Sequence, residues 1–214
     1  MTRGEMKAEV LRRLRETSDG TEVFWRDTDV EFALNEGLME ISDATEWNEK
    51  FQVVDLLIGQ NYYDARTLMR HPFLVAGPAF NVTTNRWLDM TTTRQLDMGD
   101  FQWEDRLAEP DRMIIRGLWW IGYWPMRNST LGKVKQYYAA LPDAMDEDSD
   151  EPGFHQSFHY GLVEYALCDL HLQDAEYSLA MDSWKEYLGY EGALRDFVQK
   201  RNTIPMMHGW AEGR

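Results

Sequence analysis

The sequence predicts an α+β fold in which an antiparallel four-helix core carries an inserted antiparallel β-module and ends in an extended C-terminal arm. Three observations support this prediction. Apolar side chains recur at helical spacing near both ends of the 214 residues. The middle has short β-branched and aromatic runs punctuated by Gly, Pro and Asn. Near the C-terminus, after Arg201, charged residues become rare. The predicted segments are a helical pair at 1–46, the β-module at 47–142, a second helical pair at 143–201 and the arm at 202–214.

The first segment contains two capping-box patterns, in which a Thr precedes a Glu by three residues. Thr2 with Glu5 begins the first predicted helix, and Thr28 with Glu31 begins the second. Apolar residues follow each box at intervals of three or four, so each helix has one face to bury. These apolar positions are Met6, Val10, Leu14, Val30, Leu34, Leu38 and Ile41.

The β-module is predicted to contain five strands, because β-branched and aromatic residues cluster between turn residues. In the fourth strand both alternating sets of side chains are apolar, which indicates burial on both faces. Residues 61–80 match no clear pattern and receive no assignment. The predicted strands are Phe51–Ile58, Trp87–Met90, Arg112–Arg116, Leu118–Trp124 and Lys133–Ala139.

The third segment begins with a run of six acids within residues 143–151, which is typical of a solvated linker. Pro152 then occupies a favoured first position of a helix. Apolar spacing predicts two long helices at 153–173 and 176–200. Pro205 is expected to end the helical region, so that residues 202–214 leave the body as an arm.

Composition limits the possible functions. With 37 acidic and 22 basic residues the formal charge is −15, and the chain lacks the basic clusters that bind nucleic acid tightly. Cys168 is the only cysteine, which excludes an intrachain disulfide and a Cys-based zinc site. No apolar run has the length of a membrane span, so no membrane partner is expected. Abundant Trp, Tyr and Met favour an assembling surface.

Several residues belong to types that carry chemistry in other proteins. His155 and His159 have the i, i+4 spacing of a metal pair, but the glutamate of a zinc hydrolase motif is absent. Asp146, Asp148 and Asp150 resemble half of a calcium loop whose obligatory Gly and final Glu are missing. Neither a nucleophile elbow nor a phosphate-binding loop is present. The sequence therefore predicts no enzyme, no cofactor and no metal.

Two apolar groups remain as candidate binding surfaces. The run from Trp119 to Trp124 suits a sugar- or base-stacking platform, although such strands more often fill a core. The uncharged C-terminal end has apolar side chains that are costly to leave in water, at about 25 cal/mol per Å². We expect it to bind a partner protein or a neighbouring subunit through Ile204, Pro205, Met206, Met207 and Trp210.

The order of elements, and several motifs within it, resemble the tailed-phage head-to-tail connector (adaptor) family from about Met6 to Arg201. The matching motifs are Trp25-Arg26-Asp27, Leu34-Asn35-Glu36-Gly37-Leu38, Gly59-Gln60 with Tyr62-Tyr63, Trp87-Leu88-Asp89, Tyr123-Trp124-Pro125, Gly132 to Tyr138 with Pro142, and Phe154 to Lys200.

This resemblance implies a virion structural protein, assembled in the host cytoplasm and located in the neck between capsid and tail. The implied partners are the portal protein, a tail or nozzle protein below, further copies of the chain in a dodecameric ring, and genomic DNA passing through the lumen. Three alternatives stay open: a tail-completion or stopper ring protein, a carbohydrate-binding module and a small metal-dependent hydrolase.

Overall fold

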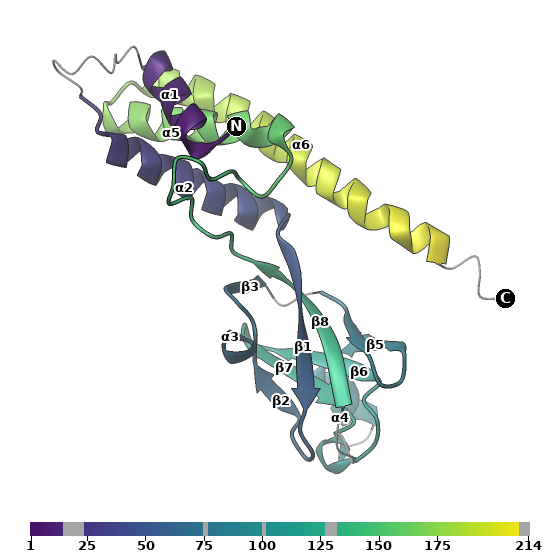
Figure 1. Cartoon of the computed structure of the whole chain (residues 1–214). Coiled ribbons are helices and arrows are strands. Elements are labelled where there is room, and N and C mark those ends of the chain that lie inside the picture. Colours follow the sequence, from purple (N-terminus) through teal and green to yellow (C-terminus); the bar gives the residue numbers. More distant parts are fainter. Residues whose placement is uncertain (15–23, 75–76, 100–101, 127–131, 210–214) are drawn as a thin grey trace. The chain divides into compact units, whose positions relative to one another are not determined.

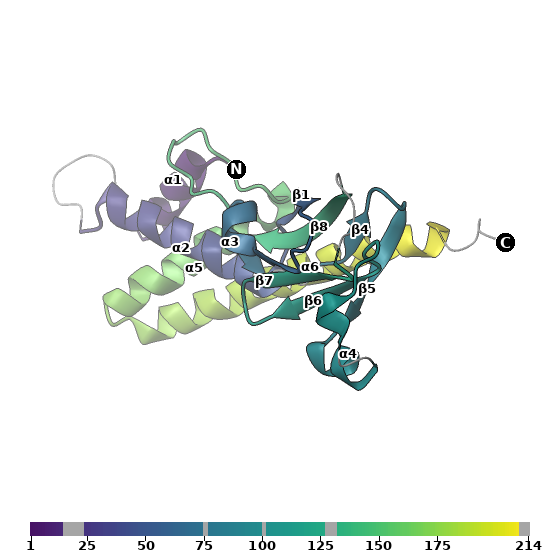
Figure 2. The same cartoon turned by 90° about the horizontal axis from the view of Figure 1, so that it is seen from below.

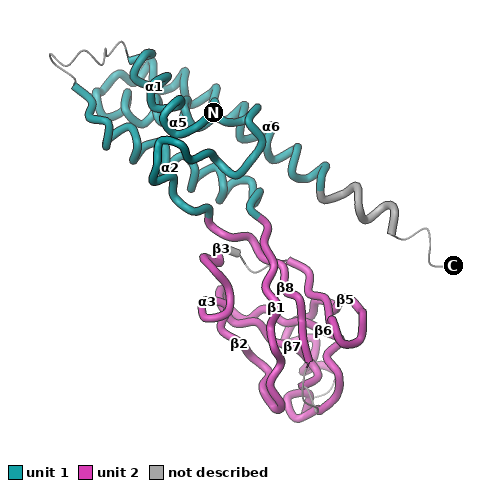
Figure 3. The backbone as a smooth tube through the Cα atoms, in the orientation of Figure 1, with its two compact units in different colours: residues 1–48, 142–214 teal, residues 49–141 magenta. Residues whose placement is uncertain are grey.

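The computed structural model describes residues 1–14, 24–74, 77–99, 102–126 and 132–209, with the backbone alone for 202–209. It divides into two compact units (Figure 3). Residues 1–48 and 142–214 form the first, here called the helical unit. Residues 49–141 form the second, here called the sheet unit. Each unit is described by itself.

The helical unit contains four α-helices and one 3-10 turn among its described residues (Figure 1). Thr2 caps the first helix and forms the predicted capping box with Glu5. The second predicted box is wrong, because the helix begins two residues earlier: the Arg26 backbone N–H donates to Asp29 Oδ2 at 3.0 Å. The elements are α1 Arg3–Arg13, α2 Asp27–Thr45, η2 Gln156–Phe158, α5 His159–Gln173 and α6 Tyr177–Gly209.

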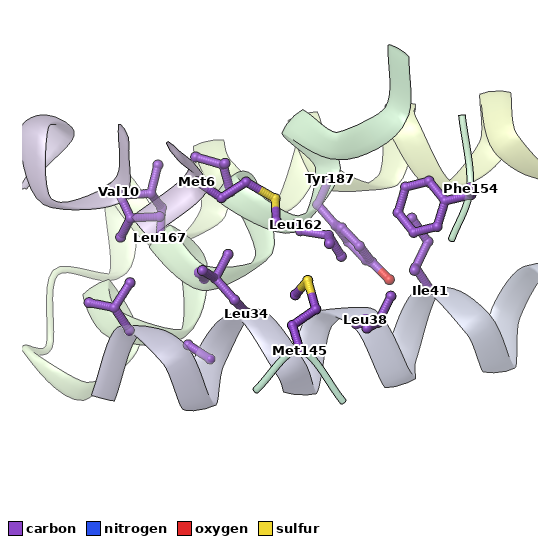
Figure 4. Close-up of a cluster of buried hydrophobic side chains, with 14 of the residues drawn as sticks. Met6, Val10, Leu34, Leu38, Ile41, Met145, Phe154, Leu162, Leu167 and Tyr187 are labelled. Atoms are coloured by element: carbon purple, nitrogen blue, oxygen red, sulfur yellow. The ribbon is translucent and has the colours of Figure 1, made fainter. Parts of the chain in front are cut away.

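The core of the helical unit is built from residues far apart in the sequence (Figure 4). All four helices contribute side chains, and the segment that precedes η2 and α5 adds Met145 and Phe154. Burying one large aliphatic side chain contributes about 1.5–3 kcal/mol. The fully buried side chains include Met6, Val10, Leu34, Ile41, Leu162 and Tyr187.

The acidic segment 143–151 is anchored to the helices, although most of its carboxylates are exposed as predicted. Asp148 Oδ1 lies 2.8 Å from Arg3 Nη2 and 3.3 Å from Lys7 Nζ. The Met145 N–H donates to Asn35 Oδ1 at 2.8 Å. The hydrogen bond to Glu31 is the largest of the causes that raise the pKa of Lys7. The segment therefore closes the helical unit and is more than a solvated linker.

The fifth helix starts at His159, six residues later than the sequence suggested. Pro152 and Phe154 are buried, which holds the chain against the core before it can coil. The His155 side chain accepts a hydrogen bond from the Ser157 N–H and caps the short η2 turn. Tertiary packing has overridden the helix-start signal at the proline.

The sheet unit is a curled eight-stranded sheet with the order β1-β8-β4-β5-β6-β7-β2, and β3 pairs with β8 (Figures 1 and 2). Its strands are β1 Glu49–Leu56, β2 Tyr62–Asp64, β3 Pro72–Leu74, β4 Ala79–Asn81, β5 Arg86–Thr91, β6 Arg112–Arg116, β7 Trp120–Trp124 and β8 Gly132–Ala140. The short helices are α3 Ala65–Leu68, α4 Thr93–Gly99 and η1 Trp103–Asp105. All five predicted strands exist, and the unassigned residues 61–80 supply three more and α3.

The predicted fold class is wrong in its main features. The molecule is mixed α/β with a large sheet and six α-helices in its described part, in place of an antiparallel four-helix core. The helices of the helical unit also differ in length, since α1 has 11 residues and α6 has 33. The β-module is not purely antiparallel either, because β5 and β6 pair in parallel.

The expected break at Pro205 is also absent, since the backbone of residues 202–209 continues α6. Proline has a helical φ, so a long helix can continue past it. The cost in stability comes from the missing N–H and from the clash of the ring with the carbonyl four residues earlier. At about 1.5 Å per residue the helix is roughly 50 Å long. The described part of the chain contains no helix both long and apolar enough to span a membrane.

Candidate interaction surface

The predicted C-terminal contact residues lie at the end of α6. Ile204, Pro205, Met206 and Met207 have a helical backbone, and their side chains lie outside the described part of the structure. Trp210 falls outside the described residues altogether. The structure therefore supplies a helical end for this segment and leaves its contacts to experiment.

His155 and His159 do not face a common point. His159 is buried, with Nε2 3.0 Å from the Phe154 carbonyl oxygen and Nδ1 2.8 Å from the Met1 nitrogen. A neutral ring protonated on Nε2 donates to the Phe154 carbonyl and accepts a hydrogen bond from the Met1 ammonium through Nδ1. Burial is the main cause that lowers the pKa of His159. His155 accepts the Ser157 N–H through Nδ1, so each histidine has a packing or capping role.

Asp148 and Asp150 of the acidic segment bind different partners. Asp150 Oδ2 accepts the backbone N–H groups of Asp146 and Glu147, both at 2.8 Å. Asp148 pairs with Arg3 and Lys7, which lower the pKa of its carboxyl. Among the described residues no cluster of three His, Cys, Asp or Glu side chains is arranged to hold a metal ion.

Cys168 lies buried in α5, and desolvation raises the pKa of its thiol. A thiol attacks as the thiolate, so a raised pKa opposes nucleophilic reactivity at neutral pH. Packing therefore accounts for this residue.

The aromatic run of β7 mainly fills the interior, as the commoner pattern suggests. Tyr123 is buried and its hydroxyl lies 3.2 Å from Gln136 Oε1. Trp124 is buried on the opposite face, and its Nε1 donates to the Trp103 carbonyl at 2.7 Å. Side chains on both faces of β7 are thus buried, but Leu118, which belongs to the predicted strand, and Trp120 are exposed, so the predicted burial on both faces holds only in part.

A different set of aromatics lies on the outer surface of the sheet unit. In β1 and β8 the even-numbered residues point inward, and the odd-numbered ones point outward. Five of the outward side chains of β1, β8, β4 and β5 form what we call the aromatic face. Its members are Phe51, Phe80, Trp87, Lys135 and Tyr137.

The rings of the aromatic face contact one another across four neighbouring strands. Ring centroids are 6.0 Å apart for Phe51 and Tyr137, 5.9 Å for Tyr137 and Trp87, and 5.1 Å for Trp87 and Phe80. Even so, Phe51 is 54% exposed and Trp87 is 57% exposed. A contiguous exposed aromatic patch of this kind is typical of a binding surface.

Lys135 projects from the middle of the aromatic face. Its Nζ lies 3.9 Å from the Phe51 ring centroid and 4.7 Å from the Tyr137 ring centroid, within cation–π range. Within the described ranges no carboxylate lies at ion-pair distance from this ammonium, whereas nearby Lys133 pairs with Asp55 at 3.5 Å. The aromatic face thus offers rings and one positive charge to a binding partner.

The helical unit exposes a complementary set of side chains on α2. Phe32, Glu36, Met39 and Asp43 recur at intervals of three or four residues, so they form one stripe along the helix, here called the acidic stripe. All four are exposed, and Phe32 is 63% exposed. In the part of the chain that the structure describes, neither Glu36 nor Asp43 has an ion-pair partner.

The two units differ sharply in charge. The sheet unit has 10 acidic and 11 basic residues, whereas the rest of the chain has 27 acidic and 11 basic residues. The net negative charge of the protein therefore comes from the helical unit, because the acidic and basic residues of the sheet unit nearly balance.

Sequence reasoning missed the aromatic face because it assigned the strand aromatics to a core. A signal was available in β8, where Lys133, Lys135 and Tyr137 alternate with Val134, Gln136 and Tyr138. The lysines mark the odd positions as the solvent side. The partners from β4 and β5 come from pairings that the sequence does not reveal.

Comparison with known proteins gives one family match. The family described as SU10 adaptor protein matches residues 1–207, which is nearly the whole chain. No curated protein matches the chain. The match confirms the resemblance to phage head-to-tail adaptors, and it implies a virion structural protein that interacts with other phage structural proteins. The chain belongs to the SU10 adaptor protein family.

Proposed function

We propose that this protein forms a ring beneath the portal, links the capsid to the tail and continues the DNA channel. The observation that carries the proposal is the family match over residues 1–207. Its mechanism is the formation of interfaces, without catalysis. The exposed apolar side chains of both units support it, because a ring subunit needs surfaces for two neighbours and for the proteins above and below.

The charge distribution supports a role for the helical unit along the channel. DNA that must slide through a ring without adhering meets a repulsive wall if acidic residues line the lumen. The helical unit has 27 acidic residues with residues 142–214 included, and it is the candidate for that lining. A ring structure with a basic lumen would rule this out.

The C-terminal end of α6 is the proposed contact with the portal or a neighbouring subunit. Ile204, Pro205, Met206, Met207 and Trp210 form an apolar sequence after the charged Lys200 and Arg201. Truncation after Arg201 should abolish portal capture in a pull-down with purified portal. A matched control replaces residues 202–214 with a Gly/Ser segment of equal length. Undiminished capture by the truncated chain would contradict the proposed contact.

Mixing the purified chain with its portal tests the ring itself. Native mass spectrometry should find twelve copies of the chain on each portal ring, and the absence of any complex would overturn the proposal. A tail-completion or stopper protein would instead capture the component below the adaptor. Exposed strand aromatics are also what a carbohydrate-binding module needs, so oligosaccharides are a control: we expect them to leave tryptophan fluorescence unchanged.

A further inference from the structure

We propose that the aromatic face of one copy binds the acidic stripe of the next copy, which forms the subunit interface of the ring. The inference rests on the proposed ring function and adds to it the residues that join neighbouring copies. The carboxylate of Glu36, or that of Asp43, pairs with the ammonium of Lys135. Phe32 and Met39 pack on the exposed rings.

The chemistry of the two surfaces is complementary. On the aromatic face, a lysine without an ion-pair partner among the described residues stands between Phe51 and Tyr137. On the acidic stripe, two carboxylates without ion-pair partners in the described ranges alternate with two exposed apolar side chains. The two surfaces carry opposite charges, and each has exposed apolar side chains on which the other can pack.

The unequal charge of the two units points to a second copy of this chain as the occupant. A near-neutral unit and a strongly acidic unit on the same chain favour contacts between unlike units over contacts between two acidic ones. A contact between two different surfaces of identical chains is heterologous, and such contacts close into rings when the rotation permits. DNA is a poor occupant, because the face supplies only one unpaired cation among the residues that the structure describes.

Charge reversal tests this pairing. The variant Lys135→Glu places an acid against the stripe, and the double variant Glu36→Lys, Asp43→Lys places lysines against the face. Each alone should lower ring formation on the portal by at least about tenfold, because like charges face each other at every interface. All three positions are at least partly exposed, so the variants should fold, which circular dichroism checks. Lys185→Glu on exposed α6 is the matched control and should assemble normally.

A one-to-one mixture of the two variants gives the sharpest result. In an alternating ring, every acid introduced at position 135 meets lysines on its neighbour, and every remaining Lys135 meets a native acidic stripe. The mixture should therefore restore rings that contain equal numbers of both variants, measured by native mass spectrometry. No restoration in the mixture, or normal rings from Lys135→Glu alone, overturns the inference.

Two further outcomes separate this inference from what it rests on. If the mixture fails but one chain with all three substitutions assembles, the face and the stripe meet within one chain, and the intersubunit pairing is overturned. If the unmodified protein forms no ring on the portal, the proposed function fails first. If the unmodified protein and Lys135→Glu both form normal rings, only this inference is overturned and the proposed function stands.

Discussion

The cores of the helical unit and the sheet unit are assembled from the chain in different ways. The helical unit joins residues 1–48 to residues beyond 141, so its core forms only when two distant parts of the chain meet. The sheet unit is one continuous segment with its own core. The helical unit is strongly acidic and held by ion pairs to Arg3, Lys7 and Arg13, whereas the sheet unit is almost neutral. The stability of the two units should therefore respond to different perturbations.

The largest difference between the stabilities of the two units is expected from a cavity in the core of the helical unit. Leu34→Ala should lower the free energy of unfolding of the helical unit by about 2–5 kcal/mol, because Leu34 is fully buried. The sheet unit should keep its own transition. Chemical denaturation followed by circular dichroism measures both. Leu188→Ala, at an exposed site on α6, is the matched control and should change stability little. Equal losses in the two variants would break the comparison.

A smaller loss is expected from the ion pair between α1 and α5. Arg13 Nη1 lies 2.5 Å from Glu164 Oε1, and the Glu164 side chain is nearly buried. Arg13→Ala leaves that carboxylate without its cation, so the helical unit should lose about 1–3 kcal/mol. Arg12→Ala removes an exposed arginine that pairs only with Glu9 among the described residues, so it should change the stability much less than Arg13→Ala. A similar cost for both would show that the buried pair has no special role.

The variant Tyr123→Phe is the corresponding test in the sheet unit. The substitution removes the hydroxyl that lies 3.2 Å from Gln136 Oε1 in the interior of the sheet unit. The expected cost is about 1 kcal/mol, confined to the sheet transition. Tyr137→Phe, on the aromatic face, serves as the control and should be close to neutral in the isolated chain. A shift of the helical transition by Tyr123→Phe would contradict independent units.

The smallest effect should come from pH and should act on the helical unit alone. Burial lowers the pKa of His159 below its ordinary value of 6.5, so the unfolded chain binds the proton first as the pH falls. The contribution of His159 is complete above pH 6.5 and is lost as the pH falls from there to the lowered pKa. His159→Gln should flatten the profile in this range. A rise in stability as the pH falls below 6.5 would refute the assignment.

The local elements were largely predictable from the sequence. The apolar spacing in α2 and α6 identified helices, and clusters of β-branched and aromatic residues identified β6 and β8 as strands, since each pattern is a property of adjacent residues. The Thr2 capping box was found for the same reason. Short elements such as β2, β3 and α3 escaped, because three or four residues carry too little periodicity.

Long-range features were not predictable from periodicity. The parallel pairing of β5 with β6 depends on α4 and the segment between them, which gave no helical signal in the sequence. The late start of α5 depends on the burial of Phe154 against distant helices. The aromatic face depends on the pairings of β8 with both β1 and β4. A family resemblance identified the protein class, but the binding surfaces required the structure.

The most direct test of the account is electron microscopy of the chain bound to its portal. The account predicts a closed ring of twelve copies in which each aromatic face contacts the acidic stripe of its neighbour, and the helical units line an acidic channel. A portal without a ring, or a basic channel inside a ring joined through other surfaces, would contradict it.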